Sequence, residues 1–551
     1  MMKNRIRSCT AVLLTLVSFG TRALAVTADE EAARIEGLAA MEPVQREETA
    51  VQPLMAIEKT WDIEDTHAPA SSPLVTAMSF VRGAMGADAA SRTFYASIGT
   101  GAVEWPELEM TACGAEGLNV AWVDDYGWDD PAAAVSSGTA YSLIAWTETE
   151  YEYITVTFTG LPMVILHTGD GALPGDEYGP ASVQVTSGEY DAVSSVAQVH
   201  KRGGNVRQEE KISIRVEFAK QKKKGGYGKD RVSLLGMPKD SDWLLISNES
   251  DETLLRNYMG WQLWKKMNPE GDAFCLLESR MVELCVNDAY MGVYALQQRV
   301  KPSRELKALG YSEKDLAARL ITESNIETRA VRDTSETFYG GWMELRNQPE
   351  DRTADDCFAV YDDYLKLCAP AGENQPDDAA FLALSEEHTD IPALMRYFLF
   401  FQAAGLGDDN VKNNNYIWAV QKQGKTVYCL SPWDMDQGFN DHGVADGVCF
   451  SLTWPVRLLT LDAPGCREAL WADWNTQRST VLSEDAVYAW TEGLEQEMNA
   501  SGAWLREAAR WPGRADTCSL AQDREFILAH LENIERDMKN LWPLPGMTSG
   551  E

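Results

Sequence analysis

The sequence predicts an α+β protein, in which a β-rich part is followed by a helix-rich part and a small β domain precedes both. Strand patterns dominate between about residues 151 and 300, whereas helical periodicity takes over after about residue 300. Roughly the last hundred residues are rich in Trp, Leu and Glu and favour helices. Because polar clusters fall where the two parts meet, we expect a ligand site between them.

The first 25 residues predict a secretory signal peptide. Three basic residues precede an apolar run at 11–19, and Ala23-Leu24-Ala25 supplies small residues at a cleavage point. No later stretch is apolar over the roughly 20 residues that a membrane span requires. We therefore expect an exported protein, secreted or held at the cell surface, without a transmembrane segment.

Three segments are predicted after this leader. Residues 26–70 are acidic and Ala-rich with weak periodicity, which favours a tether. Residues 71–150 contain short β-like runs broken by Gly, Asp and Pro, which predict the small β domain. The clearest strands are expected at Tyr141–Trp146 and Tyr153–Phe158. The main domain is expected over residues 151–545.

Charge and cysteine content exclude two classes of function. The formal net charge of −35 argues against a nucleic-acid-binding protein, which needs a basic face. Ten cysteines are present without a C-x-x-C pair, so a zinc site has no support. Cys357 and Cys368 are expected on one face of a single helix, roughly 16 Å apart and too far for a disulfide. Cys275 and Cys285 flank an expected hairpin and are the candidates for pairing, although mostly buried free thiols are the favoured interpretation.

The main domain begins with strands and ends with helices. A helix over Asp251–Met267 interrupts the strands, and a later helix over Ile391–Ala404 has a continuous apolar face. Runs of β-branched and apolar residues predict the strands at Pro162–His167, Lys211–Phe218, Val232–Leu235, Trp243–Ile246 and Val282–Val286.

A β-hairpin carries the most informative residues. Its strands are expected at Tyr416–Val420 and Thr426–Leu430, because Gln423-Gly424 between them is a natural two-residue turn. This turn places Asn414 opposite Trp433. The open end of the hairpin is therefore expected to gather three carboxylates and one amide, from Asp409, Asn414, Asp434 and Asp436.

Such a gathering is costly unless a cation is bound. Two carboxylates about 4 Å apart repel by roughly 4 kcal/mol at an effective dielectric constant of 20. Oxygen ligands favour Mg²⁺ or Mn²⁺. Asp409 and Asn414 also have the spacing of the catalytic-loop aspartate and the metal-binding asparagine of protein kinases. Aspartates that follow strands often only cap turns, so these residues alone leave a site without metal as an open alternative.

Basic residues upstream supply groups that suit a phosphate. Arg202, with Gly203 and Gly204 after it, would bring a guanidinium and backbone amides to a phosphate. Lys211 would add a point charge. Taken alone, this stretch favours a solvated basic loop, as does the run Lys220–Lys224.

These residues together resemble the CotH kinase family, whose founding member is a bacterial spore-coat protein. The resemblance covers roughly residues 155–540, and Pro432-Trp-Asp-Met-Asp436 is its most specific motif. The other landmarks follow the family's order, at Leu161-Pro162, Arg202–Asn205 with Lys211, Asp251–Asn257, Asn287–Tyr294, Asp390–Phe401 and Asp409–Trp418.

The resemblance implies a two-lobed fold like that of protein kinases, and transfer of the ATP γ-phosphate to Ser or Thr of surface or secreted proteins. It assigns Asp409 to the catalytic-loop aspartate and Asn414 to a ligand of Mg²⁺ or Mn²⁺. Asp434 takes the role of the metal-binding aspartate, with Asp436 supporting it.

The resemblance also assigns Arg202 and Lys211 to the nucleotide phosphates. Two departures from the family pattern are visible, the added glycine in Arg202–Asn205 and Gln297-Gln298 where the family carries a glutamate. A catalytically degenerate structural or cell-surface binding protein is therefore the alternative. A serine or cysteine hydrolase has little support, because no Gly-x-Ser-x-Gly motif is present and none of the six His residues lies in a context that suits a catalytic base.

Overall fold

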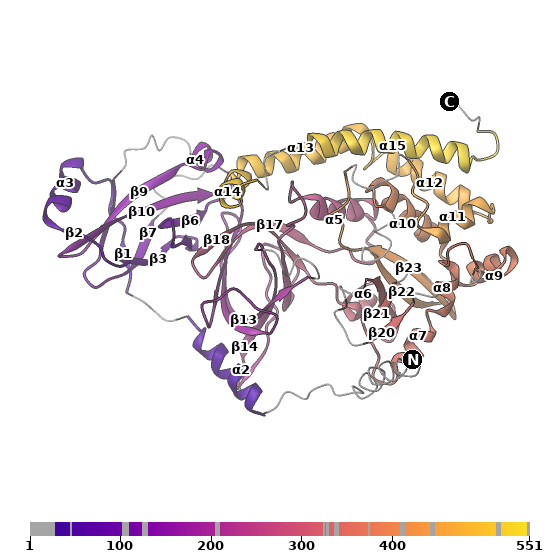
Figure 1. Cartoon of the computed structure of the whole chain (residues 1–551), viewed down its shortest axis with the longest axis horizontal. Helices are drawn as coiled ribbons and strands as arrows, with labels where there is room; N and C mark the ends of the chain where they lie inside the picture. Colours follow the sequence, from indigo (N-terminus) through magenta and orange to yellow (C-terminus); the bar gives the residue numbers. More distant parts are fainter. Residues whose placement is uncertain are drawn as a thin grey trace, which may run out of the picture.

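The computed structural model describes residues 28–43, 47–101, 109–123, 131–203, 210–322, 326, 330–334, 341–372, 375–407, 415–440, 447–513 and 519–547. The predicted leader lies outside these residues, as do Asp409 and Asn414. The described part is of mixed α+β class, as predicted: a β domain, a β-barrel and a helix-rich region follow one another along the molecule (Figure 1).

Two sheets form the β domain, and they share one apolar core. Tyr141, Leu143 and Ala145 alternate on one strand and meet Ile154, Val156 and Phe158 on the next. One sheet has the order β1 (Thr49–Ala50), β7 (Met110–Gly114), β3 (Val75–Phe80) and β4 (Gly83–Ala84). The other has the order β5 (Gly86–Asp88), β6 (Thr93–Ser97), β10 (Glu150–Thr159), β9 (Ala140–Trp146) and β8 (Asn119–Trp122), and β2 (Ala68–Pro69) pairs with β10.

The two clearest predicted strands are confirmed as β9 and β10. The domain ends later than predicted, because β10 continues across residue 150 to Thr159 and belongs to the same sheet as β9. Gly160 then leads into the barrel.

The segment 26–70 differs from the expected tether, because it contains α2 (Ala28–Ala40) and α3 (Ile57–Thr66). Leu38 of α2 is fully buried against Val196 and Ala219 of the barrel. Ile35 and Met41 lie three residues to either side of it and pack on the same cluster. This short apolar stripe is enough to dock the helix, although acidic residues dominate the composition.

The β-rich part closes into a barrel, which leaves few unpaired strand edges. β13 also pairs with β14, with Arg202 opposite Ser213, and this pairing closes the sheet. Apolar side chains such as Val164 and Ile214 fill the interior. The order is β13 (Val193–Arg202), β12 (Gly179–Thr186), β11 (Met163–Thr168), β17 (Ser279–Val286), β18 (Ala289–Gln298), β16 (Asp242–Ile246), β14 (Ser213–Gln221) and β15 (Tyr227–Lys229).

The predicted strands of this part are confirmed except for Val232–Leu235. That stretch makes only one isolated bridge, between Val232 and Asp240. The prediction was wrong because Leu235 and Gly236 both have positive φ, at 50° and 73°, which reverses the chain after a few residues.

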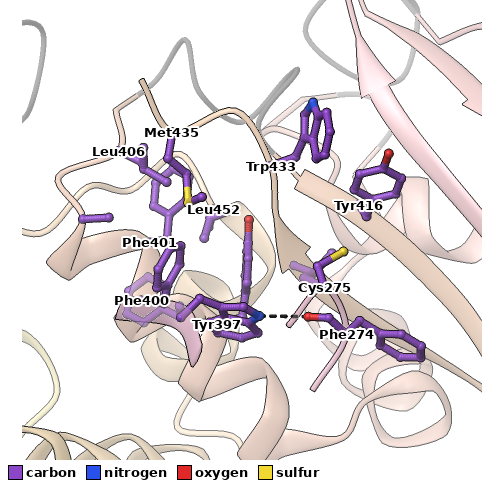
Figure 2. Packing of buried hydrophobic residues seen from close by; sticks show 14 of the residues in the cluster. Phe274, Cys275, Tyr397, Phe400, Phe401, Leu406, Tyr416, Trp433, Met435 and Leu452 are labelled. Atoms are coloured by element: carbon purple, nitrogen blue, oxygen red, sulfur yellow. Dashed lines mark hydrogen bonds between the residues drawn. The ribbon is translucent and has the colours of Figure 1, made fainter. Parts of the chain in front are cut away.

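The helix-rich region surrounds a five-stranded sheet and the buried helix α10 (Ile391–Ala403), which confirms the prediction for that segment. Tyr397, Phe400 and Phe401 of α10 lie in the core shown in Figure 2. The sheet has the order β20 (Val331–Asp333), β21 (Trp342–Leu345), β19 (Leu316–Ile321), β22 (Asn415–Lys422) and β23 (Lys425–Pro432). The other helices are α5 (Arg256–Met267), α6 (Pro302–Ala308), α7 (Ala354–Ala359), α8 (Asp362–Leu367), α9 (Asp378–His388), α11 (Thr453–Thr460), α12 (Cys466–Arg478), α13 (Glu484–Ala500), α14 (Ala503–Arg510) and α15 (Ala521–Leu541).

The eight cysteines that the structure describes form no disulfide with one another, and most of them are buried, as favoured from the sequence. Cys275 and Cys285 are not paired: Ser431 Oγ lies 3.1 Å from the Cys275 sulfur, and Cys285 contacts the Met163 sulfur. Cys357 and Cys368 do not share a helix as predicted, because α7 ends before α8 begins. Among the described helices, none combines the length and the apolar character needed to cross a membrane.

Candidate functional site

The hairpin of β22 and β23 has the predicted turn and register. Gln423 and Gly424 have φ of 54° and 81°, as a two-residue hairpin turn with two positive φ values requires. Asn415 pairs with Pro432 at the other end of the hairpin. The predicted pairing of Asn414 with Trp433 would be the next along, and Asn414 lies outside the described residues.

Two apolar anchors alternate with two acids just after β23. Trp433 and Met435 are buried and belong to the apolar cluster drawn in Figure 2. Asp434 between them is exposed, and Asp436 is half-buried. Asp434 has a φ of 55°, a left-handed conformation that costs a non-glycine residue roughly 1 kcal/mol. Such strain is concentrated at functional sites.

Helix α5 fixes this acidic segment in place. The side-chain oxygen of Asn257 accepts a hydrogen bond from the backbone N–H of Met435, at 3.3 Å. Gly260, one turn further along α5, packs directly on the same methionine, since a Cβ at this position would lie 2.5 Å from the Met435 sulfur. The helix thus holds the residue that separates Asp434 from Asp436.

The start of α5 is itself held by buried charges. Asp251 accepts hydrogen bonds from the backbone N–H groups of Thr253 and Arg256, and the Arg256 guanidinium contacts Asp523 of α15 at 2.8 Å. Burial raises the pKa of Asp251 to about 6, against the opposing effect of Arg256. These bonds form a turn, so α5 begins at Arg256 and not at Asp251 as predicted. Just before this turn, the Ser250 hydroxyl donates to Asp436 at 2.5 Å.

Lys211 is buried two residues before the start of β14, where it forms an ion pair with Glu507 of α14. The other Glu507 oxygen accepts the backbone N–H of Val293 on β18, at 2.7 Å. The Lys211 ammonium also lies 5.2 Å from the centre of the Tyr294 ring. Buried charges in proteins are almost always paired, and both charges of this pair are satisfied in that way.

Gly292 makes the position of Glu507 possible. It has a φ of 87°, and a Cβ there would lie 2.0 Å from the Glu507 carboxylate oxygen. Glu507 was not among the residues predicted from the sequence. It lies 296 residues from Lys211, and no local pattern distinguishes it from the many other acids of the chain.

Arg202 connects the barrel to the acidic segment. It ends β13 opposite Ser213, two residues beyond Lys211, and its guanidinium carbon lies 6.0 Å from the centre of the Trp433 ring. A second connection runs from Ser213 to Ser247 at the end of β16, whose hydroxyls are 3.1 Å apart. Ser247 lies shortly before Ser250, whose hydroxyl binds Asp436. These contacts bring the described residues of the predicted site to the same end of the barrel: Arg202, Lys211, Asp434 and Asp436.

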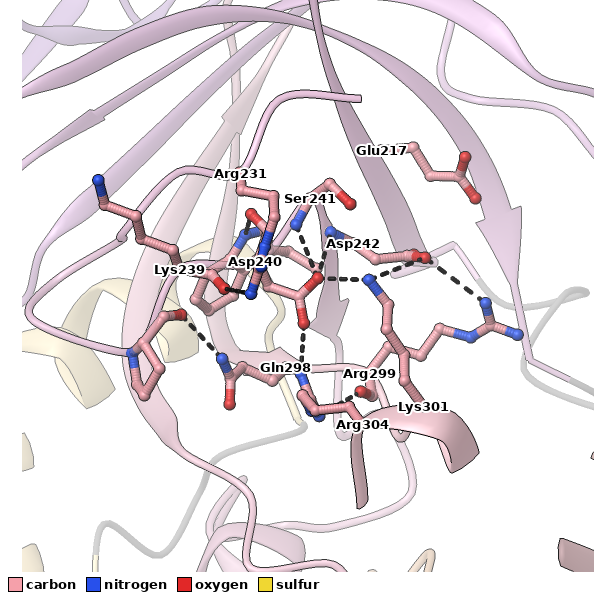
Figure 3. A network of polar contacts seen from close by, with 12 residues as sticks. Glu217, Arg231, Lys239, Asp240, Ser241, Asp242, Gln298, Arg299, Lys301 and Arg304 are labelled. Atoms are coloured by element: carbon pink, nitrogen blue, oxygen red, sulfur yellow. Dashed lines mark hydrogen bonds and ion pairs between the residues drawn. The ribbon is translucent and has the colours of Figure 1, made fainter. Parts of the chain in front are cut away.

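Gln298, the departure from the family pattern, lies elsewhere. Its amide nitrogen donates to the carbonyl of Pro238 at 2.8 Å, beside the network of Asp240 with Lys301 and Arg304 shown in Figure 3. On β18 it is four residues from Tyr294, which corresponds to about 13 Å along a strand. The Gln298 side chain is therefore hydrogen-bonded beside this network, and the carboxylate partner of Lys211 comes from α14.

Among the described residues, no group of three or more His, Cys, Asp or Glu is arranged to hold a metal ion. Asp434 and Asp436 are two of the four predicted ligating or catalytic oxygen donors, and the other two, Asp409 and Asn414, lie outside the described residues.

A family model described as CotH kinase protein matches residues 199–536, more than half of the chain. The matched region includes Arg202, Lys211, Asp434, Asp436 and Glu507, and it begins after the β domain and after β11 and β12. No curated protein matches the chain.

Proposed function

The chain belongs to the CotH kinase family, and on this basis we propose that it is an exported kinase that transfers the γ-phosphate of ATP to Ser or Thr of secreted or surface proteins. The observation that carries the proposal is the buried ion pair of Lys211 with Glu507, at the same end of the barrel as Asp434. Phosphoryl transfer needs a cationic side chain that is fixed against the phosphates, and it also needs carboxylates that hold a metal ion. Protein kinases use a lysine–glutamate pair to fix the cationic side chain.

Glu507 orients the Lys211 ammonium for contact with the phosphates. Because Glu507 is also bound by the Val293 N–H, the lysine is held in one orientation before nucleotide arrives. We assign Lys211 and Arg202 to the nucleotide phosphates, with Lys211 as a fixed point charge and Arg202 as a planar donor of several N–H groups. Cations held in advance cost no reorganisation during the reaction.

The acidic segment suits a hard divalent cation. Asp434 and Asp436 offer carboxylate oxygens, which fit Mg²⁺ or Mn²⁺, and we assign them to its binding together with Asn414. When bound, this ion would neutralise charge on the phosphates. Asp409 is proposed to accept the proton of the substrate hydroxyl. The core contacts of Trp433 and Met435 keep the two described carboxylates in a fixed position.

The competing function, a degenerate binding protein, drew part of its support from Gln298. The other departure, the added glycine in 202–205, lies partly outside the described residues. The Gln298 side chain bonds to Pro238 in a separate network, and a carboxylate partner for Lys211 is present in Glu507. Gln298 therefore gives no reason to assume that catalysis has been lost.

The test is phosphate transfer by the purified full chain, with labelled ATP, Mg²⁺ or Mn²⁺, and a Ser-rich protein substrate. We expect label on the substrate, and its loss in Asp434→Asn. Asparagine tolerates positive φ, so this variant should keep the wild-type unfolding temperature. Asp62→Asn, at an exposed acid of α3, is the matched control and should keep full activity. Absence of label from the wild-type chain with either metal would contradict the proposal.

A further inference from the structure

The β domain lies outside the matched family region, yet it contacts the corner at Ser501 and Gly502 that leads into α14, the helix that carries Glu507. From these contacts we infer that the β domain braces α14 and thereby positions the Glu507 carboxylate against Lys211. The inference rests on the proposed function for its consequence in catalysis, but its structural part is independent of that function. Three sets of contacts carry it.

The first contact is made by Gly160, the residue that joins β10 of the β domain to the barrel. Its backbone N–H donates to the carbonyl of Ser501 at 3.2 Å. Ser501 is fully buried and ends α13, and Gly502 then begins the turn into α14. The hydrogen bond therefore fixes the corner from which α14 starts.

The second contact is on the other side of the same corner. Gly502 has a φ of 64°, and a Cβ on it would lie 2.3 Å from the carbonyl oxygen of Val135. Val135 belongs to α4 (Pro131–Ser137) of the β domain, and α4 and α14 are neighbours in Figure 1. The close approach leaves this corner little room to move.

The third contact reaches α14 through side chains. Tyr95 of the β domain stacks on Tyr290 of β18, with ring centres 4.7 Å apart. The Tyr290 hydroxyl donates to Glu283 at 2.6 Å, and Glu283 pairs with Arg506 at 2.6 Å. Arg506 also donates to the Ser501 carbonyl at 2.6 Å, so it shares an acceptor with Gly160.

These contacts converge on the residues next to Glu507. Arg506 is its neighbour in sequence, and the corner at Gly502 lies five residues before it. A helix as short as α14 owes most of its order to tertiary packing. A shift of the corner would therefore move the Glu507 carboxylate, and a displacement of about 1 Å can lower a catalytic rate by roughly 100-fold.

Gly160→Ala tests the brace directly. A Cβ at this position would lie 2.6 Å from the Ser501 backbone, and the backbone conformation of Gly160 does not itself demand glycine. The matched control is Gly101→Ala, also in the β domain, because a Cβ there meets no atom within 4 Å. The measurement is hydrogen–deuterium exchange of the Val293 amide, which reports the Glu507 contact without any need for activity.

In Gly160→Ala we expect the Val293 amide to exchange roughly tenfold to 100-fold faster, the change that corresponds to loss of one hydrogen bond to a charged group. Amides in the middle of β10 should keep their protection, and Gly101→Ala should match wild type. Phosphate transfer should fall in Gly160→Ala, with about 100-fold as the expected size.

Tyr95→Leu provides a second variant, which removes the ring stack without adding volume and remains informative if Gly160→Ala does not fold. It should raise Val293 exchange in the same direction. Unchanged exchange at Val293 in folded variants would overturn the inference. A wild-type chain without phosphate transfer would instead contradict the proposed function, and the exchange result would still decide whether the brace exists.

Discussion

Lys211 and Glu507 are each only 1% exposed, so both charges have been removed from water. Removing one partner of such a pair leaves the other charge buried and unpaired, at a cost of about 3–5 kcal/mol. We expect Lys211→Met and Glu507→Leu each to lower the free energy of unfolding by this amount. The double variant Lys211→Met/Glu507→Leu should recover most of the loss, because it removes both charges. Urea unfolding of the single and double variants measures the coupling.

An exposed pair on the same chain serves as the control. Lys366 and Asp363 of α8 are 53% and 37% exposed, and pairs of this kind contribute well under about 1 kcal/mol. Lys366→Met should therefore change stability little. Single variants at Lys211 and Glu507 that unfold like wild type, or strictly additive losses in the double variant, would show that the pair is not buried as described.

Of the two residues of the ion pair, Lys211 was predicted from the sequence and Glu507 was not. Lys211 stands next to a recognisable strand, and Asp434 and Asp436 follow a hairpin with a distinct turn, so local chemistry was sufficient to select them. Glu507 reaches Lys211 only through the packing of α14 on β18, which no spacing in the sequence encodes.

Whole elements were predicted where a turn motif determines them, and they were misplaced where nearby side chains or backbone angles override the pattern. The hairpin of β22 and β23 was predicted with its register, because Gln423-Gly424 determines both. The start of α5 was misplaced, because the side chain of Asp251 binds backbone N–H groups that a longer helix would have used. The stretch at 232–235 has strand-like residues, but two successive positive φ values turn the chain there.

Helix α5 gives the element-scale prediction, through its glycine against Met435. Replacing glycine by alanine inside an exposed helix stabilises it by about 1 kcal/mol. At Gly260 we expect a loss of activity, because the new Cβ would displace Met435 and with it Asp434 and Asp436. Gly260→Ala should therefore lower phosphate transfer by an amount of the order of 100-fold, the effect expected from a displacement of about 1 Å.

The matched control for Gly260→Ala is Gly493→Ala, in an exposed part of α13 where a Cβ meets no atom within 4 Å. It should raise the unfolding temperature and leave activity unchanged. Equal activity in the two variants would mean that Met435 does not set the position of the acidic segment.

The whole molecule depends on contacts that join distant parts of the chain. The barrel needs the parallel pairing of β11 with β17, which places Met163 opposite Glu283. The docking of α2 and the brace on α14 are likewise made between segments far apart in sequence. The fold class was predictable because strands and helices are locally encoded, whereas closure of the barrel is a property of long-range pairing.

Nucleotide binding should change the stability of the whole chain. A ligand that binds only the folded protein stabilises it by about 2.7 kcal/mol when its concentration is 100 times its dissociation constant. ATP with Mg²⁺ should therefore raise the unfolding temperature of the wild-type chain. ATP with a chelator should raise it less, because Asp434 and Asp436 would then face the phosphates without a cation between them.

The two variants that remove a charge from the site should respond differently from each other. Asp434→Asn should lose the dependence on metal but keep some response to ATP, because Lys211 and Arg202 remain. Lys211→Met should lose the response to ATP altogether. A chain that retains the family fold only as a structural or binding protein would melt at the same temperature with and without nucleotide. Since the measurement needs no protein substrate, it separates loss of the nucleotide site from a wrong choice of substrate in the transfer assay.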